Sequence, residues 1–504
     1  MMMKFSRLLT SLIAVFALTG SAWAQDKTNL TTAQGPLGVY AKVDIEDAIA
    51  GFPVTTPGPP SATVLHAYLR NLYAGLLADP AISGIAAGQR WDHIEASEGV
   101  EDWSYLDDIF AEANLVQKSV LLNITPGFDS PAWLLAEIPS CDGLFAVTNT
   151  ASPDCGKVTF SGFPEEIRAD GVVLPLPWNS IYQEAWKDFL TDLNARYQPN
   201  PAFVAMAVAG PVGASTEVIL PTSANTSTPQ LGGLPADALW AALIKNSFPD
   251  TTDYQNTDQA FIDSWDQTID AYEQIFAGVT LFIGADDGSD LPEFSNKIKP
   301  HSDNTLYGQD CGADKHDLMS CEAKTEILSH FVTAAGPNGK STQVGGMTAS
   351  STLTDGNIGV PGVKVLTSLT PPPSPAFQGG AEFDFAVSGS NAQLEGCPKY
   401  PKKCKNLSPE EGGYYVLKVF FNQTTAGKSY GGMNGSAPIQ YLNVPYLDVQ
   451  YAQANLCPAT KSKIIGNTSL QDLLNMASHD IFGMAGQPTP LPPPTCTDKQ
   501  VDLP

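Results

Sequence analysis

Glu217 is a carboxylate in a setting where it could do chemistry. It lies in the stretch STEVILP, residues 215–221, shortly after the apolar run FVAMAVAGPVGA of residues 203–214. Such an apolar run is typical of a strand that is buried on both faces. A carboxyl group just past the end of a strand can exchange a proton with a ligand or attack it, provided that this end of the strand binds ligands. The type of sheet decides whether it does.

Eight strand-like segments alternate with helix-like segments along the chain. The expected strands are 38–45, 82–91, 119–125, 203–210, 279–285, 342–349, 376–386 and 439–449. The expected helices are 62–79, 103–117, 181–197, 259–278, 321–336, 412–424 and 469–483. Eight β/α units favour an α/β fold of the (β/α)8 TIM-barrel type over a doubly wound sheet, and no glycine-rich nucleotide loop follows the first strand. The sixth unit has the weakest helical pattern.

Four long insertions separate a strand from its following helix, near 139–178, 218–258, 286–320 and 387–411. In a TIM barrel, these loops lie at the carboxyl ends of the strands, which is the face where ligands bind. On this fold, Glu217 would lie at the ligand-binding face.

The stretch QRWDHIEASEGVEDWSYLDD, residues 89–108, is the most specific motif in the chain. It resembles the signature that follows the second barrel strand in clan A glycoside hydrolases, notably the family of thermophilic β-galactosidases. GFDSPAWLL, residues 127–135, is similar to the stretch after the third strand of that family. The resemblance implies that Arg90 and Trp91 lie at a substrate cleft. The proline that the family has after Glu95 is Ala96 here.

The same resemblance implies a pair of catalytic carboxylates. Clan A enzymes carry the acid/base at the end of the fourth strand and the nucleophile at the end of the seventh. The matching residues are Glu217 and Glu382, with Asp384 as an alternative to Glu382. Two carboxyl groups at the barrel mouth suit a retaining mechanism. Thr216 replaces the asparagine that precedes the acid/base in the family.

Several aromatic residues are expected at the barrel mouth, where their faces could stack against the C–H faces of a sugar ring. Besides Trp91 they are Phe128, Trp178 and Tyr446. Tyr446, or alternatively Tyr451, would take the place of the aromatic residue that the family has after the eighth strand. Any of these side chains could instead belong to the core.

Eight cysteines suggest four disulfides between neighbours in the sequence. The expected pairs are Cys141–Cys155, Cys311–Cys321, Cys397–Cys404 and Cys457–Cys496. Three pairs lie in or beside the long loops and the fourth lies near the C-terminus. Zinc binding is the alternative, but the chain has no CxxC motif.

The N-terminus has the pattern of a signal peptide. Lys4 and Arg7 precede an apolar segment from Leu8 to Leu18, and Ala22 to Ala24 form a small-residue cleavage site. The expected domains are therefore a signal peptide at 1–24, a barrel at 25–484 and a proline-rich tail at 485–504, in a secreted or periplasmic protein. An uncleaved membrane anchor is the alternative, although the apolar segment is short for one.

The formal net charge of −26 does not favour a nucleic acid or an anionic membrane as a partner. No metal or cofactor is expected, because none of the six histidines forms an HxH or HExxH motif. No GxSxG motif of a serine hydrolase follows a strand either. The sequence thus predicts a glycoside hydrolase that acts on a neutral glycan or glycoside. The alternative is a TIM barrel that binds carbohydrate without hydrolysing it.

Overall fold

The computed structural model describes a part of the 504-residue chain. The described residues are 36–53, 58–142, 154–160, 172–210, 220, 236–249, 254, 259–283, 327, 330–331, 379–382, 410, 439–455 and 468–484. The predicted signal peptide and the proline-rich tail lie outside these ranges, as do the expected strand at 342–349 and the expected helix at 412–424. Residues 327, 330 and 331 are helical, within the helix expected at 321–336.

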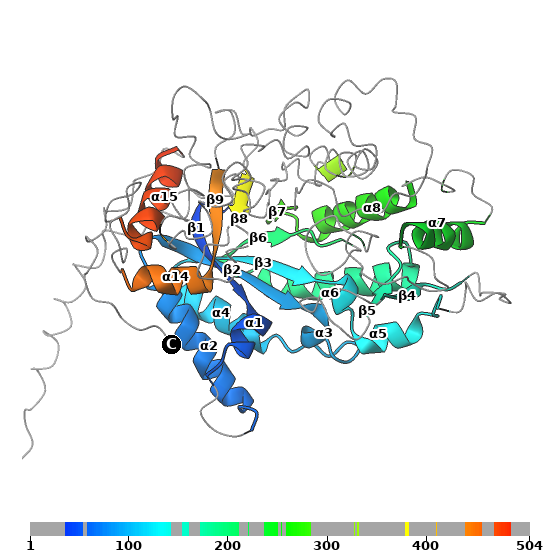
Figure 1. Cartoon of the computed structure of the whole chain (residues 1–504), viewed down its shortest axis with the longest axis horizontal. Helices are drawn as coiled ribbons and strands as arrows, with labels where there is room; N and C mark the ends of the chain where they lie inside the picture. Colours follow the sequence, from blue (N-terminus) through cyan, green and yellow to red (C-terminus); the bar gives the residue numbers. More distant parts are fainter. Residues whose placement is uncertain are drawn as a thin grey trace, which may run out of the picture. The chain divides into compact units, whose positions relative to one another are not determined.

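Seven parallel strands form the main sheet (Figure 1). They are β1 (Gly38–Asp44), β2 (Ile82–Arg90), β3 (Ser119–Thr125), β6 (Phe203–Ala207), β7 (Thr280–Phe282), β8 (Gly379–Glu382) and β9 (Ile439–Pro445). Each corresponds to one of the expected strands. Continuous apolar sequences such as Ile85–Ala87 and Val120–Leu122 explain this arrangement, since parallel strands are covered on both faces.

The strand order has the cyclic pattern of an α/β barrel. In the order β7-β6-β3-β2-β1-β9-β8, successive strands of this sheet are neighbours except β7 and β8, which are its two edges. The last strand, β9, pairs with the first, β1. Val39 pairs with Ile82 on one side of β1 and with Leu442 on the other. In a doubly wound sheet the strand order reverses about a switch point, whereas here the order continues from β9 to β1 without a reversal.

The two faces of the sheet differ in what they contact. On β1, Val39, Ala41 and Val43 belong to the large core shared with the helices. The alternate residue Tyr40 belongs to a second core, formed entirely by strand residues: Tyr40, Ala86, Leu121, Ala205, Ala207, Phe282 and Tyr441. The period of two residues thus separates an outer face, covered by helices, from an inner face that packs on itself.

Helices follow the strands and cover the outer face. They are α1 (Ile45–Ala50), α2 (Ala62–Leu77), α3 (Trp91–Ile94), α4 (Ser104–Leu115), α5 (Ala132–Glu137), α6 (Ser180–Tyr197), α7 (Ala236–Ser247), α8 (Gln259–Ile275), α14 (Tyr446–Gln453) and α15 (Leu470–Met484). Side-chain caps fix several of the starts, among them those of α2 and α6. Ser61 Oγ accepts from the Val64 amide at 3.4 Å, and Asn179 Oδ1 accepts from the Tyr182 amide at 3.0 Å.

Two details differ from the sequence expectations. The eighth strand ends at Pro445 rather than at residue 449, and α14 begins at Tyr446, because Pro445 has no amide hydrogen to extend the ladder. The insertion near 139–178 contains a short antiparallel pair, β4 (Lys157–Phe160) and β5 (Val172–Pro175). Within the described ranges, no helix combines the length and the apolarity that crossing a membrane requires.

Candidate active site

The inner face changes character along the strands. Toward the amino ends it carries the apolar cluster that includes Tyr40, Leu121 and Tyr441. Two and four residues further along the same strands, the inward positions are polar. They are Lys42 and Asp44 on β1, Arg90 on β2, Asn123 and Thr125 on β3, and Asn443 on β9, while Gly88 on β2 has no side chain. The polar inward positions therefore lie at the carboxyl ends of the strands, where barrel enzymes bind their ligands.

Arg90 is the centre of a charged network at the end of β2. Its Nε lies 3.0 Å from Asp129 Oδ1, and its Nη2 lies 2.5 Å from Asp92 Oδ2. Its backbone amide also donates to Glu46 Oε1 at 3.4 Å. The guanidinium fork thus contacts carboxylates from two separate segments, and its side chain remains about a quarter exposed, at 27%. Arg90 is therefore held in place and still reaches solvent.

Asp129 comes from the short 3-10 helix η2 (Gly127–Asp129), which follows β3 directly. Its Oδ2 accepts a hydrogen bond from Thr125 Oγ1 at 2.7 Å. Burial raises the pKa of Asp129 to about 6, although the Thr125 hydrogen bond and the Arg90 charge act in the opposite direction. This carboxyl group therefore changes its charge in the mildly acidic range.

Asp44 and Glu46 form a second acidic pair, at the end of β1. Burial raises the pKa of Asp44 to about 7, and the charges of Glu46 and Asp47 add to the shift. For Glu46, burial acts to raise the pKa, but hydrogen bonds from His93 and from the backbone outweigh it, and the net pKa is lowered. His93 Nδ1 lies 2.8 Å from Glu46 Oε1, and this hydrogen bond raises the pKa of His93.

These groups combine a carboxyl that holds its proton near neutral pH with a carboxylate that stays ionised. Asp44 provides the first and Glu46 the second. Such a set can donate hydrogen bonds to a neutral polar ligand as well as accept them. In the described part of the chain, no group of three or more His, Cys, Asp or Glu residues is arranged to hold a metal ion.

Trp91 lies elsewhere than the resemblance implies. Its side chain is fully buried, in contact with Trp186 and Phe189 at ring-centroid distances of 4.9 and 5.5 Å. Its Nε1 donates to Glu95 Oε2 at 2.8 Å. Since neighbouring side chains cover both the ring and its N–H, Trp91 fixes α3 against α6. We assign it to packing and no longer to the substrate cleft.

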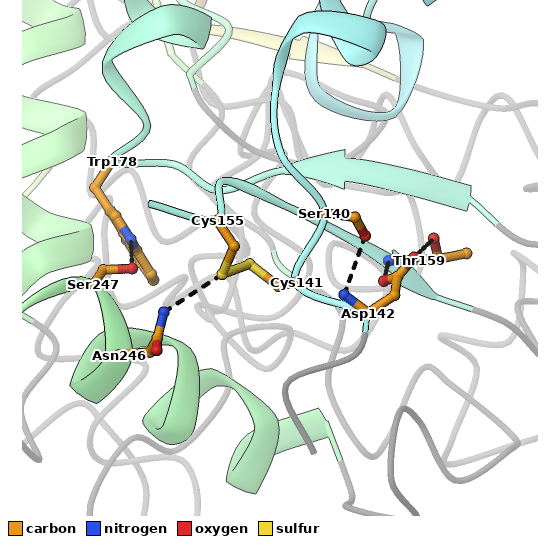
Figure 2. The surroundings of a disulfide bond; sticks show 8 residues. All are labelled: Ser140, Cys141, Asp142, Cys155, Thr159, Trp178, Asn246 and Ser247. Carbon is orange, nitrogen blue, oxygen red and sulfur yellow. Dashed lines mark hydrogen bonds between the residues drawn. A yellow bond between two sulfur atoms is a disulfide. The ribbon is translucent and has the colours of Figure 1, made fainter. Parts of the chain in front are cut away.

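Phe128 and Trp178 are both packed against protein. Phe128 lies in η2 and is 6% exposed. Trp178 is partly buried, packs edge-on against Trp240, and donates from Nε1 to Ser247 Oγ at 3.0 Å (Figure 2).

The Cys141–Cys155 disulfide is present, as expected from the sequence. It closes a loop beside Trp178, and Asn246 of α7 donates to Cys155 Sγ at 3.4 Å (Figure 2). The other six cysteines lie outside the described residues. The disulfide therefore joins two positions of the insertion that follows β3, and Cys155 lies next to α7.

Tyr446 lies near the acidic pair of β1. It is the first residue of α14, and burial raises the pKa of its hydroxyl, with smaller contributions from Tyr68 and from the charges of Asp47 and Asp44. Its ring is half-buried against the large core. Among the aromatic residues expected at the mouth, Tyr446 is thus the one with a described electrostatic link to Asp44.

The two expected catalytic residues are described to different extents. Glu217 lies outside the described residues, and so does Asp384. Glu382 is the last residue of β8, and its Cα partner on β9 is Asn443. Gly380, two residues earlier, pairs with Tyr441 of the inner cluster. The backbone of Glu382 is therefore in register with Asn443, at the end of β8.

Sequence reasoning missed Asp44, Glu46, Asp129, Asn123 and Asn443. A signal was present in the strand period. Once Tyr40 is placed inward, alternation places Asp44 inward at the end of the same strand, and Asn123 follows Leu121 in the same way. Asp129 could not be found by alternation, because it lies beyond the end of β3 in η2.

Comparison with solved structures finds glycoside hydrolases. The catalytic domain of beta-amylase from Paenibacillus polymyxa is 10% identical, with 82% of this chain and 94% of that chain covered at a TM-score of 0.40. A GH5-4 broad specificity endoglucanase from an uncultured bacterium is 7% identical, with 91% and 100% covered at a TM-score of 0.42. Endo-glycoceramidase II from Rhodococcus sp. is 13% identical, with 89% and 80% covered at a TM-score of 0.36.

No family model and no curated protein sequence matches the chain. The assignment to an α/β barrel depends on the strand order and on the two faces of the sheet described above. The resemblance to glycoside hydrolases that was expected from the sequence is found again among the solved structures.

Proposed function

We propose that this protein is a secreted glycoside hydrolase that acts on a neutral glycan or glycoside with retention of configuration. The catalytic carboxylates are Glu217 as acid/base and Glu382 as nucleophile. The observation that carries the proposal is the register of β8, in which Glu382 pairs with Asn443 on the inner face at the carboxyl end of the sheet. A nucleophile in a barrel glycosidase needs this place.

The proposed barrel has eight strands. The described sheet has two edges, β7 and β8, and the chain between them contains the expected strand 342–349. A strand from this segment, paired with both edges, would close the barrel and keep the cyclic order. Glu217 follows the fourth strand, whose last described residues, Ala209 and Gly210, are buried beyond the end of β6.

The proposed reaction has two steps. In the first, the Glu382 carboxylate forms a bond to the anomeric carbon, the glycosidic C–O bond breaks, and Glu217 gives its proton to the leaving oxygen. In the second, Glu217 takes a proton from water, the water oxygen bonds to the anomeric carbon, and the bond to Glu382 breaks. The enzyme returns to its starting protonation state and no cofactor is consumed.

The network around Arg90 would bind the substrate beside the catalytic pair. Arg90 and the carboxyl groups of Asp44 and Asp129 can each hydrogen-bond to a sugar hydroxyl. Phe128, Trp178 and Tyr446 would contribute apolar surface to the same substrate. A neutral substrate is favoured over an anionic one because the chain is strongly acidic.

Secretion or export to the periplasm is part of the proposal. It is supported by the signal-peptide pattern at 1–24 and by the Cys141–Cys155 disulfide, a bond that persists in oxidising compartments. Mass spectrometry of protein from the culture medium or the periplasm would test it, since a mature N-terminus near Gln25 is expected. Full-length protein retained in the cytoplasm would contradict it.

The activity is tested with a panel of aryl α- and β-glycosides. Wild type is compared with Glu217→Gln and Glu382→Gln, which keep the side-chain volume and remove the ionisable group. Glu184→Gln, at an exposed position on α6, is the control. We expect turnover by wild type and control, and a loss of several orders of magnitude in kcat for each of the other two variants.

The other outcomes separate the alternatives. Loss in only one variant keeps the reaction and rejects the other assignment. Absence of turnover together with saturable sugar binding that survives both substitutions would identify a barrel that binds carbohydrate without hydrolysing it. Stereochemistry is read separately by proton NMR of the first-formed product, whose anomeric configuration must match that of the substrate.

A further inference from the structure

Two asparagine side chains on the inner face have carbonyl groups that no described donor reaches. Asn443, on β9, is 3% exposed, and its Oδ1 is buried without a hydrogen-bond partner among the described residues. Asn123, on β3, likewise has a buried Oδ1 that receives no hydrogen bond from the described part of the chain. A buried carbonyl oxygen that lacks a donor is costly, so native structures seldom keep one without a purpose.

Both side chains project to the same side of the sheet. Asn443 alternates with Leu442 and Val444 of the outer core, and Asn123 alternates with Leu122 and Ile124. Each lies two residues beyond a member of the inner apolar cluster, Tyr441 and Leu121 respectively. With Lys42 on β1, the two amides are therefore among the first polar groups beyond the apolar cluster, and β1 and β2 separate their strands.

The residues beside the two asparagines suit an approaching ligand. Asn443 is the Cα partner of Glu382 on β8. Asn123 is the Cα partner of Gly88 on β2. Because Gly88 has no side chain, nothing projects from β2 next to Asn123 on the inner face. A Cβ added at Gly88 would lie 3.3 Å from Asp44 Oδ2, so Asp44 approaches the backbone there.

We infer that Asn123 and Asn443 form the floor of a sugar subsite inside the barrel, each accepting a hydrogen bond from a hydroxyl group of the bound sugar. The ligand class is a neutral polyol ring, because an amide oxygen accepts a hydrogen bond from a hydroxyl group. Asp44 and Arg90, at the ends of the neighbouring strands, supply a further acceptor and a further donor. The inference deepens the proposed function and rests on it: the sugar on this floor is the one whose anomeric carbon Glu382 would attack.

The test combines binding with stability. D-glucose, D-galactose, D-mannose and D-xylose are each titrated calorimetrically into wild type, Asn443→Leu and Asn123→Leu, and the melting temperature of each protein is measured. Asn475→Leu is the control, because Asn475 is equally buried, on α15, and donates to Gln471 O at 2.7 Å. The Leu side chain branches at Cγ as Asn does and is somewhat larger, but it cannot hydrogen-bond.

We expect at least one sugar to bind wild type, and each inner-face variant to weaken that binding by about tenfold or more, the scale of a lost hydrogen bond to a buried polar partner. Neither variant should lower the melting temperature, since each removes an unpartnered polar atom. The Asn475→Leu control should melt at a lower temperature and keep its sugar affinity.

Unchanged affinity in both inner-face variants, or no sugar binding by wild type, overturns the inference. A melting temperature that falls in both variants while affinity stays the same assigns the two amides a structural role. If glycosides are hydrolysed with an unchanged KM in both variants, the proposed function stands and the inference fails. If sugar binding depends on Asn443 or Asn123 but no glycoside is cleaved, the inference stands and the proposed hydrolysis fails.

Discussion

The two ends of the inner face are built differently on the same strands. Toward the amino ends, Tyr40, Leu121 and Tyr441 are buried in an apolar cluster. At the carboxyl ends, Arg90 and the carboxyl groups around it form a network of ionisable groups, in which burial shifts the pKa of Asp44 and of Asp129 upward. The difference indicates that the apolar cluster stabilises the barrel, whereas the carboxyl ends keep buried ionisable groups that are unfavourable for stability, a feature typical of functional sites.

The largest effect should come from the inner apolar cluster, to which Phe282 of β7 also belongs. Phe282→Ala removes a fully buried ring that contacts Tyr441, at a centroid distance of 6.0 Å. We expect a loss of about 3–5 kcal/mol in the free energy of unfolding, because the strands around it cannot collapse into the space. The loss, measured by chemical denaturation, should be equal at about pH 5 and about pH 8. A loss below about 1 kcal/mol would show that the inner cluster does not support the sheet.

At the polar end, Arg90→Met should have the next largest effect. It leaves Asp129 buried without its cation, which destabilises the protein by about 3 kcal/mol at about pH 8. At about pH 5, below the Asp129 pKa of about 6, the carboxyl can take up a proton, so the loss should be much smaller. Equal losses at the two pH values would contradict the assigned contact.

Asp44→Asn should stabilise the protein at neutral to basic pH. The pKa of Asp44 rises from 3.8 to about 7 on folding, so wild type loses stability as pH increases through this window. Asparagine keeps the oxygen that accepts from the Asp47 amide and carries no charge. We expect a gain of about 2 kcal/mol at about pH 8 and none at about pH 3.5, because Asp44 is then protonated in both states.

The prediction for Asp44→Asn would be wrong if the variant and wild type were equally stable at all pH values. It would also be wrong if the variant were less stable than wild type above pH 7. Either would mean that Asp44 is ionised in the folded protein without cost. A thermal unfolding series across the pH range distinguishes these cases, and the apolar Leu121→Val substitution is its control, since its effect should not depend on pH.

The smallest effect should come from Thr125→Val, which removes the hydrogen bond to Asp129 Oδ2. This hydrogen bond lowers the pKa of Asp129, so its loss should raise that pKa further above 6. We expect a loss of about 1 kcal/mol at about pH 8 and less at about pH 5. Carbon-13 NMR titration of the Asp129 carboxyl reads the pKa directly, and an unchanged value would contradict the contact.

The seven described strands of the barrel were largely predictable from sequence, because continuous apolar runs and turn residues set them apart. The end of β9 was misplaced because YLNVPYLDV is apolar on both sides of Pro445, and only the missing amide hydrogen of proline marks the change to α14. The β4–β5 pair was missed because four-residue strands carry too little periodicity.

The site was less predictable than the fold. Motif matching assigned both Arg90 and Trp91 to a substrate cleft, because a sequence motif does not state which face of a turn a side chain takes. Arg90 belongs to the charged network at the end of β2, and its role in binding stays a prediction. In the structure, the first turn of α3 directs Trp91 into the core. Asp129 and Glu46 could not be paired with Arg90 in advance, since they come from segments about 40 residues apart in the chain.

The central claim is that the carboxyl end of the inner face carries out glycoside hydrolysis through Glu382. The most direct measurement is mass spectrometry of the intact protein and its peptides after incubation with a 2-deoxy-2-fluoro glycosyl fluoride, chosen to match the sugar that wild type cleaves. We expect one added sugar per protein, bonded to the peptide at Glu382, and none in Glu382→Gln. A label on another carboxylate, or no label in a protein that turns over the matching glycoside, would contradict it.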